Sequence, residues 1–238
     1  MALRILLLLL VTVTGWFYWD ARISGLPLTA WQIDRYLDPT QPPHRIQAAL
    51  GQLSGPHPAL ARLRRYPDPG VRAEVARLAP ASDQLEDPSP WVRFRAAIGL
   101  QRNEAIAVRP VLLATLRAVT VFAEDPGSVQ WRLAEGARLG AGEELGSVDS
   151  RVFASPVPGR LIRRYVQTGD AIRRGQRLAD VAIADEWLVE ALTALGRIGL
   201  PIDAEEIRLF QSEKFPPAVQ QAAAAAVEQI QSRPRKKS

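Results

Sequence analysis

The residue types that most often carry catalysis or hold metal ions are scarce in this chain of 238 residues. It has no cysteine, and its two histidines, His44 and His57, both stand beside prolines. Thiol catalysis, disulfide scaffolds, iron–sulfur clusters and cysteine-ligated zinc sites are therefore excluded. Two histidines are also too few for a histidine-based metal cluster.

Carboxylates and hydroxyls are the remaining candidates, and neither occurs in a catalytic pattern. No serine lies in a G-x-S-x-G turn, and there is no calcium loop of the D-x-D-x-D-G type. The acid pairs Glu143–Glu144 and Glu205–Glu206 are typical of a solvated surface rather than of a glycosidase dyad, and Asp149 is expected to form a turn. We predict a non-enzymatic protein without catalytic residues, metal ligands or cofactor; an enzyme with an unrecognised site is the alternative.

The chain is basic, with a formal net charge of +5 at pH 7, and its only lysines are Lys214, Lys236 and Lys237. Arginine supplies the remaining positive charge, and part of it lies in short clusters: Arg62, Arg64 and Arg65; Arg93 and Arg95; Arg163 and Arg164; and Arg173, Arg174 and Arg177. Such clusters either bind an acidic protein or phosphate-rich surface, or keep the surface soluble and compensate helix ends. No nucleic-acid recognition motif accompanies them, so we predict no nucleic-acid partner.

Residues 119–182 have the pattern of β-strands, with frequent glycines and apolar residues near every second position. The segment contains an internal repeat, in which Gly127, Gly136 and Gly142 match Gly159, Gly169 and Gly175. In both halves a leucine follows the third glycine by three residues and a valine follows it by six. The glycines are expected to occupy turns. The predicted core positions are Val129, Leu133, Leu139, Leu145 and Val148 in one half and Leu161, Tyr165, Ile172, Leu178 and Val181 in the other.

The repeated phrase resembles the two halves of a barrel-sandwich hybrid, the fold of biotinyl- and lipoyl-like domains. Domains of this family that carry biotin or lipoate attach it to a lysine on the hairpin that joins the halves. In this chain the joint, residues 148–159, reads VDSRVFASPVPG and has no lysine. Arginine cannot replace lysine in the amide linkage, so the resemblance implies a cofactor-free domain.

The lysine-free relatives are the periplasmic adaptors, or membrane fusion proteins, of efflux pumps and type I secretion systems. The segment FASPVPGRL, from Phe153, is similar to the adaptor phrase in which an extended strand leads into a proline–glycine turn. The chain departs from that family in two ways. No long α-helical hairpin separates the halves, and a helical pattern takes the place of the later β-barrel.

A proline-bearing turn followed by a helical pattern occurs four times outside residues 119–182. The phrases are PPHRIQAALGQL from Pro42, DPGVRAEVARLA from Asp68, DPSPWVRFRAAIGLQ from Asp87 and PPAVQQAAAAAVEQI from Pro216. Asp68 and Asp87 are expected to cap helix starts, and Trp187 is expected to pack a later helix against the earlier ones. The pattern resembles the short HEAT-like repeats also found in phycobilisome lyases, which implies an α-solenoid; a generic helical bundle is the alternative.

Residues 1–19 form an apolar run, with Arg4 near its start and four aromatic residues at its end. Nineteen helical residues reach about 28 Å, close to the ~30 Å hydrocarbon core of a bilayer. An uncleaved membrane anchor is favoured over a cleavable signal peptide, because cleavage near Gly15 would leave an exposed aromatic start. The flanking arginines are nearly balanced, and we place the N-terminus inside and the body in the periplasm.

These observations predict an α+β fold, in which a β-rich barrel-sandwich hybrid domain interrupts a HEAT-like α-solenoid that follows an N-terminal transmembrane helix. The predicted boundaries are 1–20 for the anchor, 21–118 and 183–232 for the helical repeats, 119–182 for the insertion, and 233–238 for a basic disordered tail. The predicted function is an adaptor or scaffold subunit of a transport or secretion complex at the inner membrane. Protein subunits are its expected partners, and self-association into a homo-oligomer is allowed. The alternative is a HEAT-like assembly factor or chaperone for a membrane or cofactor-containing complex.

Overall fold

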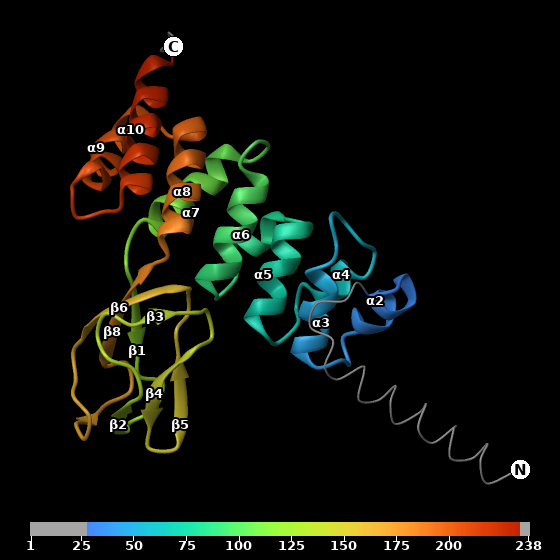
Figure 1. The fold of residues 1–238 in the computed structure, drawn as a ribbon, viewed down its shortest axis with the longest axis vertical. Coiled ribbons are helices and arrows are strands. Elements are labelled where there is room, and N and C mark those ends of the chain that lie inside the picture. Colours follow the sequence, from blue (N-terminus) through green and yellow to red (C-terminus); the bar gives the residue numbers. More distant parts are fainter. Residues whose placement is uncertain (1–27, 234–238) are drawn as a thin grey trace, which may run out of the picture.

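The computed structural model describes residues 28–233, in which helices precede and follow a block of β-strands (Figure 1). The combination of helices with two antiparallel sheets confirms the α+β class predicted from the sequence. The predicted membrane anchor, residues 1–20, lies outside the described residues, as does most of the predicted tail. Within residues 28–233, no helix combines the length and the apolar character needed to cross a bilayer.

The helices form a row that runs from α2 at one end to α9 and α10 at the other, with the strands beside α6–α8 (Figure 1). The helices before the strands are α2 (Ala30–Tyr36), α3 (Pro43–Leu50), α4 (Leu60–Leu63), α5 (Pro69–Leu78), α6 (Pro90–Leu100) and α7 (Ala105–Thr115). Those after the strands are α8 (Asp185–Ile198), α9 (Ala204–Arg208) and α10 (Pro217–Ser232). Helix α5 packs on α6, α6 on α7, α7 on α8 and α8 on α10, so the helical packing continues across the strands.

All four predicted proline-bearing turns start a helix, because α3, α5, α6 and α10 each carry proline in the first turn, where the missing N–H has no helical partner to lose. Asp68 caps α5 as predicted, accepting the amide N–H of Val71 at 2.9 Å. The predicted cap by Asp87 is wrong. The residue before α6 is Ser89, whose side chain makes no capping hydrogen bond. The phrase from Asp87 is two residues longer before its buried valine than the phrase from Asp68, which moves Asp87 outside the capping position.

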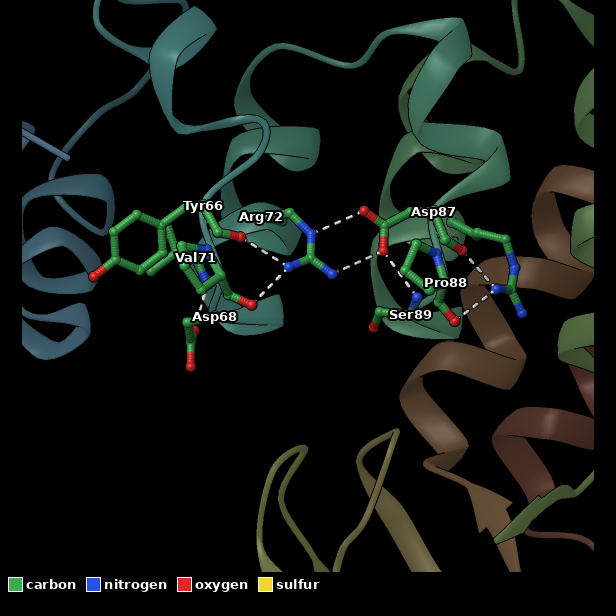
Figure 2. A network of polar contacts seen from close by, with 9 residues as sticks. Tyr66, Asp68, Val71, Arg72, Asp87, Pro88 and Ser89 are labelled. Carbon is green, nitrogen blue, oxygen red and sulfur yellow. Dashed lines mark hydrogen bonds and ion pairs between the residues drawn. The ribbon is translucent and has the colours of Figure 1, made fainter. Parts of the chain in front are cut away.

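Asp87 instead joins α5 to the turn before α6 (Figure 2). Its carboxylate accepts two hydrogen bonds from Arg72, from Nε at 2.9 Å and from Nη2 at 3.0 Å. Arg72 Nη1 also donates to the carbonyls of Tyr66 and Pro67, both at 2.8 Å. A bidentate, largely buried arginine–carboxylate pair of this kind fixes the spacing of consecutive helices.

The strands form two four-stranded antiparallel sheets, and the same pattern of strand order occurs in both. The strands are β1 (Val119–Phe122), β2 (Gly127–Trp131), β3 (Arg138–Leu139), β4 (Glu144–Val148), β5 (Arg151–Ala154), β6 (Gly159–Arg164), β7 (Ala171–Ile172) and β8 (Arg177–Ile183). One sheet has the order β1-β8-β6-β3 and the other β5-β4-β2-β7. Exchanging β1–β4 with β5–β8 converts one order into the other, so each half of the segment contributes strands to both sheets.

Backbone hydrogen bonds also occur at matching positions of the two halves. They show that the repeat includes more residues than the phrase recognised in the sequence. The N–H of Gly142 donates to the carbonyl of Ser155 at 2.8 Å, and that of Gly175 donates to the carbonyl of Ala123 at 2.7 Å. Both glycines have positive φ, 77° and 76°, as expected for turns that favour glycine. Ser155 follows β5 and Ala123 follows β1, so these two strands belong to the repeat as well.

Eight of the ten predicted core positions in the strands are buried. The prediction for Tyr165 is wrong: it is 37% exposed, and its neighbour Val166 is buried instead. Tyr165 stands four residues before Gly169, whereas the matching Leu133 stands three before its glycine. One extra residue exchanges the inward and outward side chains of a strand. Leu133 itself is only half-buried.

Trp187, in the first turn of α8, packs the helix that follows the strands onto α6, as predicted. It is 7% exposed, and its ring stacks on that of Phe94 with 4.5 Å between the centroids. The buried cluster that contains both residues also includes Leu145 and Leu161 from the strands. The helices and the sheets therefore share one hydrophobic core.

Candidate functional site

The two histidines have different surroundings. His44 is exposed in the first turn of α3. His57 Nε2 lies 3.2 Å from Asp34 Oδ1, and His57 Nδ1 accepts the amide N–H of Ala59 at 3.3 Å. With a backbone donor on Nδ1 and a carboxylate facing Nε2, neither ring nitrogen is left to accept a proton from a nucleophile.

The adjacent acids considered in the sequence point to separate partners. Glu143 accepts the amide N–H of Gly140 at 2.7 Å, whereas Glu144 pairs with Arg132, just after β2, at 2.6 Å. Glu206 pairs with an arginine at 3.1 Å, and Glu205 is exposed. Across residues 28–233, no three histidine, cysteine, aspartate or glutamate side chains gather closely enough to hold a metal ion.

Asp180 of β8 lies in a polar cluster with side chains from β1, from β8 and from the residue after β6. Its carboxylate accepts hydrogen bonds from Thr120 at 2.7 Å, from Tyr165 at 2.6 Å and from Arg177 at 3.1 Å. Burial raises the pKa of Asp180, but the hydrogen bonds and the nearby guanidinium outweigh burial and lower the pKa below its usual value. A carboxylate that is ionised and surrounded by donors is unsuited to proton transfer.

Asp203 forms a second buried ion pair, with Arg109 of α7. The Asp203 side chain is 3% exposed, and both Nε and Nη2 of Arg109 donate to it. The amide N–H of Leu200 also donates to Asp203, at 2.7 Å. Burial raises the pKa of Asp203, but these hydrogen bonds outweigh burial and lower the pKa below its usual value. The pair holds the start of α9 against α7 and leaves no free acid or base.

A groove of about 660 Å³ runs between the first turns of α5 and α6 and the strands β1 and β5. We call it the edge groove. Its helix side is formed by Pro69, Pro88, Pro90 and Trp91, and its strand side by Phe122, Val152, Phe153 and Pro156. An adjoining hollow of about 370 Å³ shares Pro69, Trp91 and Gly142 with it and adds Gln47, Asp68, Glu74 and Ala141.

Both strands that line the edge groove stand at the edge of a sheet. Among the described strands, β1 pairs only with β8 and β5 pairs only with β4, so each presents one side whose backbone groups have no strand partner. Phe122 of β1 is 54% exposed and Val152 of β5 is 60% exposed. The edge groove therefore combines exposed apolar side chains with unpaired backbone donors and acceptors.

The charge of the edge groove is negative. Asp125 and Arg151 neutralise each other as an ion pair. Glu124 is exposed, and no cation pairs with it among residues 28–233. In the adjoining hollow, the hydrogen-bond donors to the Asp68 side chain among residues 28–233 are neutral, the Val71 amide and Gln47, and no cation pairs with it. The groove therefore favours a ligand with apolar and basic groups.

Sequence reasoning did not identify Phe122 and Val152. The available signal is that Phe122 alternates with buried Val121 and Ala123, which predicts an outward-facing side chain on a strand. That signal does not tell whether the strand lies at the edge of a sheet, which depends on pairing with residues about 60 positions away.

The turn that joins the two halves of the β-segment consists of Asp149 and Ser150, between β4 and β5. Asp149 has a φ of 51°, and its carboxylate accepts the amide N–H of Ser128 at 3.0 Å. The expected turn role of Asp149 is confirmed. Neither residue carries an amine, and within residues 28–233 lysine occurs only at 214, in the loop before α10.

The sequence matches no known protein family, and no curated protein is similar to it. A functional interpretation consequently depends on the geometry described above.

Proposed function

We propose that this protein is a non-enzymatic, membrane-anchored adaptor or scaffold subunit of a cell-envelope transport or secretion complex, which binds a partner protein in the edge groove. In this proposal residues 1–20 anchor the chain in the inner membrane and the body lies in the periplasm. The helices form a HEAT-like solenoid, and the strands form a barrel-sandwich hybrid that carries no cofactor.

The strand order supports the barrel-sandwich part of the proposal. Two sheets that exchange strands about a pseudo-twofold relation are what the resemblance to biotinyl- and lipoyl-like domains implies. The joint between the halves offers Asp149 and Ser150 where a carrier domain requires lysine. These features favour a binding module over a carrier of a swinging group.

The helix starts support the solenoid part of the proposal. Arg72 and Arg93 follow buried valines in consecutive helices, and each donates from Nη1 to the carbonyls five and six residues before it. The same local construction in neighbouring helices is expected of repeats that stack side by side.

The observation that carries the binding function is the edge groove, with two sheet edges open beside exposed Phe122 and Val152. An extended segment of another protein can add to such an edge through its backbone while its side chains fill the groove. The apolar lining and the charge of Glu124 and Asp68 suit a segment with apolar and basic residues. This partner chemistry distinguishes the groove from a site for an acidic ligand.

The test is recovery of partner proteins with the full-length chain from solubilised membranes. The double variant Phe122→Glu/Val152→Glu is expected to recover at least about tenfold less of any stoichiometric partner, because it adds charge to an apolar, already negative groove. The matched control is Ile202→Glu/Leu209→Glu, which alters two exposed apolar residues, 75% and 68% exposed, in the α9 region. Equal loss from both variants, or no loss from the first, would contradict the proposal.

The same preparation separates an adaptor from an assembly factor or chaperone. A pulse of labelled amino acids followed by a chase is expected to leave this chain in the mature complex, at constant stoichiometry. Loss of the chain as the complex matures would favour the assembly factor.

A further inference from the structure

Arg93 has the same local construction as Arg72 but lacks the carboxylate that Arg72 binds. Each guanidinium is oriented by its own turn. Arg72 Nη1 donates to the backbone carbonyls of Tyr66 and Pro67. Arg93 Nη1 donates in the same way to the backbone carbonyls of Asp87, at 2.7 Å, and Pro88, at 3.0 Å. In both side chains these bonds use Nη1 and leave Nε and Nη2 as the remaining donors.

The next element differs for the two arginines. Arg72 meets the turn before α6, where Asp87 fills its Nε–Nη2 edge (Figure 2). After α6 and α7 the chain enters β1, so no further turn of this kind supplies a carboxylate. Among residues 28–233, no acceptor occupies Nε or Nη2 of Arg93, and the side chain is only half-buried.

A pocket of about 430 Å³ lies beside Arg93, between α6, α7, the start of α8 and the strands. Its described lining is apolar apart from two threonines and this arginine, and it includes Phe94, Val111, Val157 and Trp187. Arg93 is the one charged side chain among those lining residues. Thr115 and Thr120 use their hydroxyls to donate to Val111 and to Asp180. The pocket is of a size that holds small ligands.

We infer that this pocket binds a carboxylate on an apolar body, with the carboxylate on Nε and Nη2 of Arg93 as Asp87 lies on Arg72. The guanidinium is already held by two carbonyls, so binding costs little ordering of the side chain. The two parallel N–H groups match the two oxygens of one carboxylate. The apolar body lies against Val111 and Val119, which line the pocket and are only half-buried.

A single arginine, with no other charged side chain in the pocket lining, selects a monoanion over a phosphate. A phosphate dianion at neutral pH would bring a second negative charge into a lining with no second cation. The pocket adjoins the edge groove at Pro88, Pro90 and Pro156 but has its own lining. The inference is therefore independent of the function proposed for that groove.

Calorimetric titration of the full-length protein with phenylacetate tests the inference, with phenylacetamide as the uncharged analogue. Phenylacetate is expected to bind and phenylacetamide to bind at least about tenfold more weakly. Arg93→Gln and Arg93→Lys are both expected to weaken phenylacetate binding by about tenfold or more, because each removes the paired N–H groups. The control Arg102→Gln changes an exposed arginine just after α6 and is expected to leave binding unchanged.

A second variant keeps the test decisive if Arg93→Gln fails to fold. Ala114→Phe places a ring in the pocket lining without altering Arg93, and it is expected to abolish phenylacetate binding. A blocked peptide, LEDPSPW, copied from residues 85–91, distinguishes a natural ligand that is a polypeptide from one that is a free acid. The control peptide has asparagine in place of the aspartate. Tighter binding of the aspartate peptide than of phenylacetate indicates a carboxylate carried by a polypeptide, and weaker binding indicates a free acid. The inference would be overturned by equal binding of phenylacetate and phenylacetamide, or by no binding of either phenylacetate or the peptide. Full affinity for phenylacetate in Arg93→Gln or Ala114→Phe would also overturn it.

Discussion

At the scale of single residues, the buried carboxylate of Asp203 makes stability depend on pH. Its pKa in the folded protein is lowered by Arg109 and by the Leu200 amide, so the unfolded chain binds its proton more readily. The stabilisation is complete above the usual aspartate pKa of about 4. It is lost as the pH falls through the lower pKa of the folded state.

Asp203→Asn is therefore expected to reduce the free energy of unfolding at pH 7 by about 3 kcal/mol, because it leaves Arg109 without its charged partner. Urea unfolding at several pH values measures this difference, which is expected to shrink below about pH 4, where the unfolded wild-type chain takes up a proton that the folded carboxylate does not yet bind. Glu206→Gln is the control, since its partner Arg117 is 72% exposed and such pairs contribute under about 1 kcal/mol. A pH-independent difference would rule out the ion pair as the cause.

The sequence does not reveal this residue, because Asp203 and Arg109 are 94 positions apart and neither lies in a repeated phrase. Asp87 is the opposite case. Its Asp-Pro phrase is visible in the sequence, but two additional residues before the buried valine change its role from a cap to a partner of Arg72.

At the scale of elements, the glycine turns are the part of the fold that the sequence predicts best. Gly142 and Gly175 both have positive φ, a conformation that glycine alone adopts without cost. The pairing of β1 and β5 with their sheets is not visible, because matching positions such as Ala123 and Ser155 share a hydrogen-bond pattern rather than a residue type. The sequence also fails to predict the strand register at Tyr165. One extra residue before Gly169 turns the Tyr165 side chain outward and buries Val166 instead.

Gly142→Ala and Gly175→Ala are each expected to lower the free energy of unfolding by about 1 kcal/mol, because alanine is strained at positive φ. Gly140→Ala is the control. It lies two residues from Gly142, its φ is not in the left-handed region, and an added Cβ would only make an ordinary contact with Glu143 at 3.5 Å. Chemical denaturation of the three variants measures the effects. Equal effects at Gly140 and Gly142 would show that backbone conformation is not the reason for glycine in these turns.

At the scale of the whole molecule, Trp187 connects the helices on the two sides of the strands. Trp187→Ala is expected to destabilise the protein by about 3 kcal/mol, because it removes a buried ring stacked on Phe94 and leaves a cavity. The control Trp31→Ala removes a ring that is 59% exposed and is expected to cost under about 1 kcal/mol. Thermal and urea unfolding measure both variants. A Trp187→Ala effect no larger than that of Trp31→Ala would mean that α8 does not depend on α6 for its packing.

The most direct test of the central proposal is site-specific photocrosslinking in native membranes, with the photoreactive residue at Val152 in the edge groove or at Ile202 as control. The proposal predicts one major protein adduct from Val152 and none from Ile202, retained in the assembled complex. The mass of the unlinked chain is expected to show neither lipoate nor biotin. No adduct from Val152, equal adducts from both positions, or a mass increase that matches either prosthetic group would contradict the proposal.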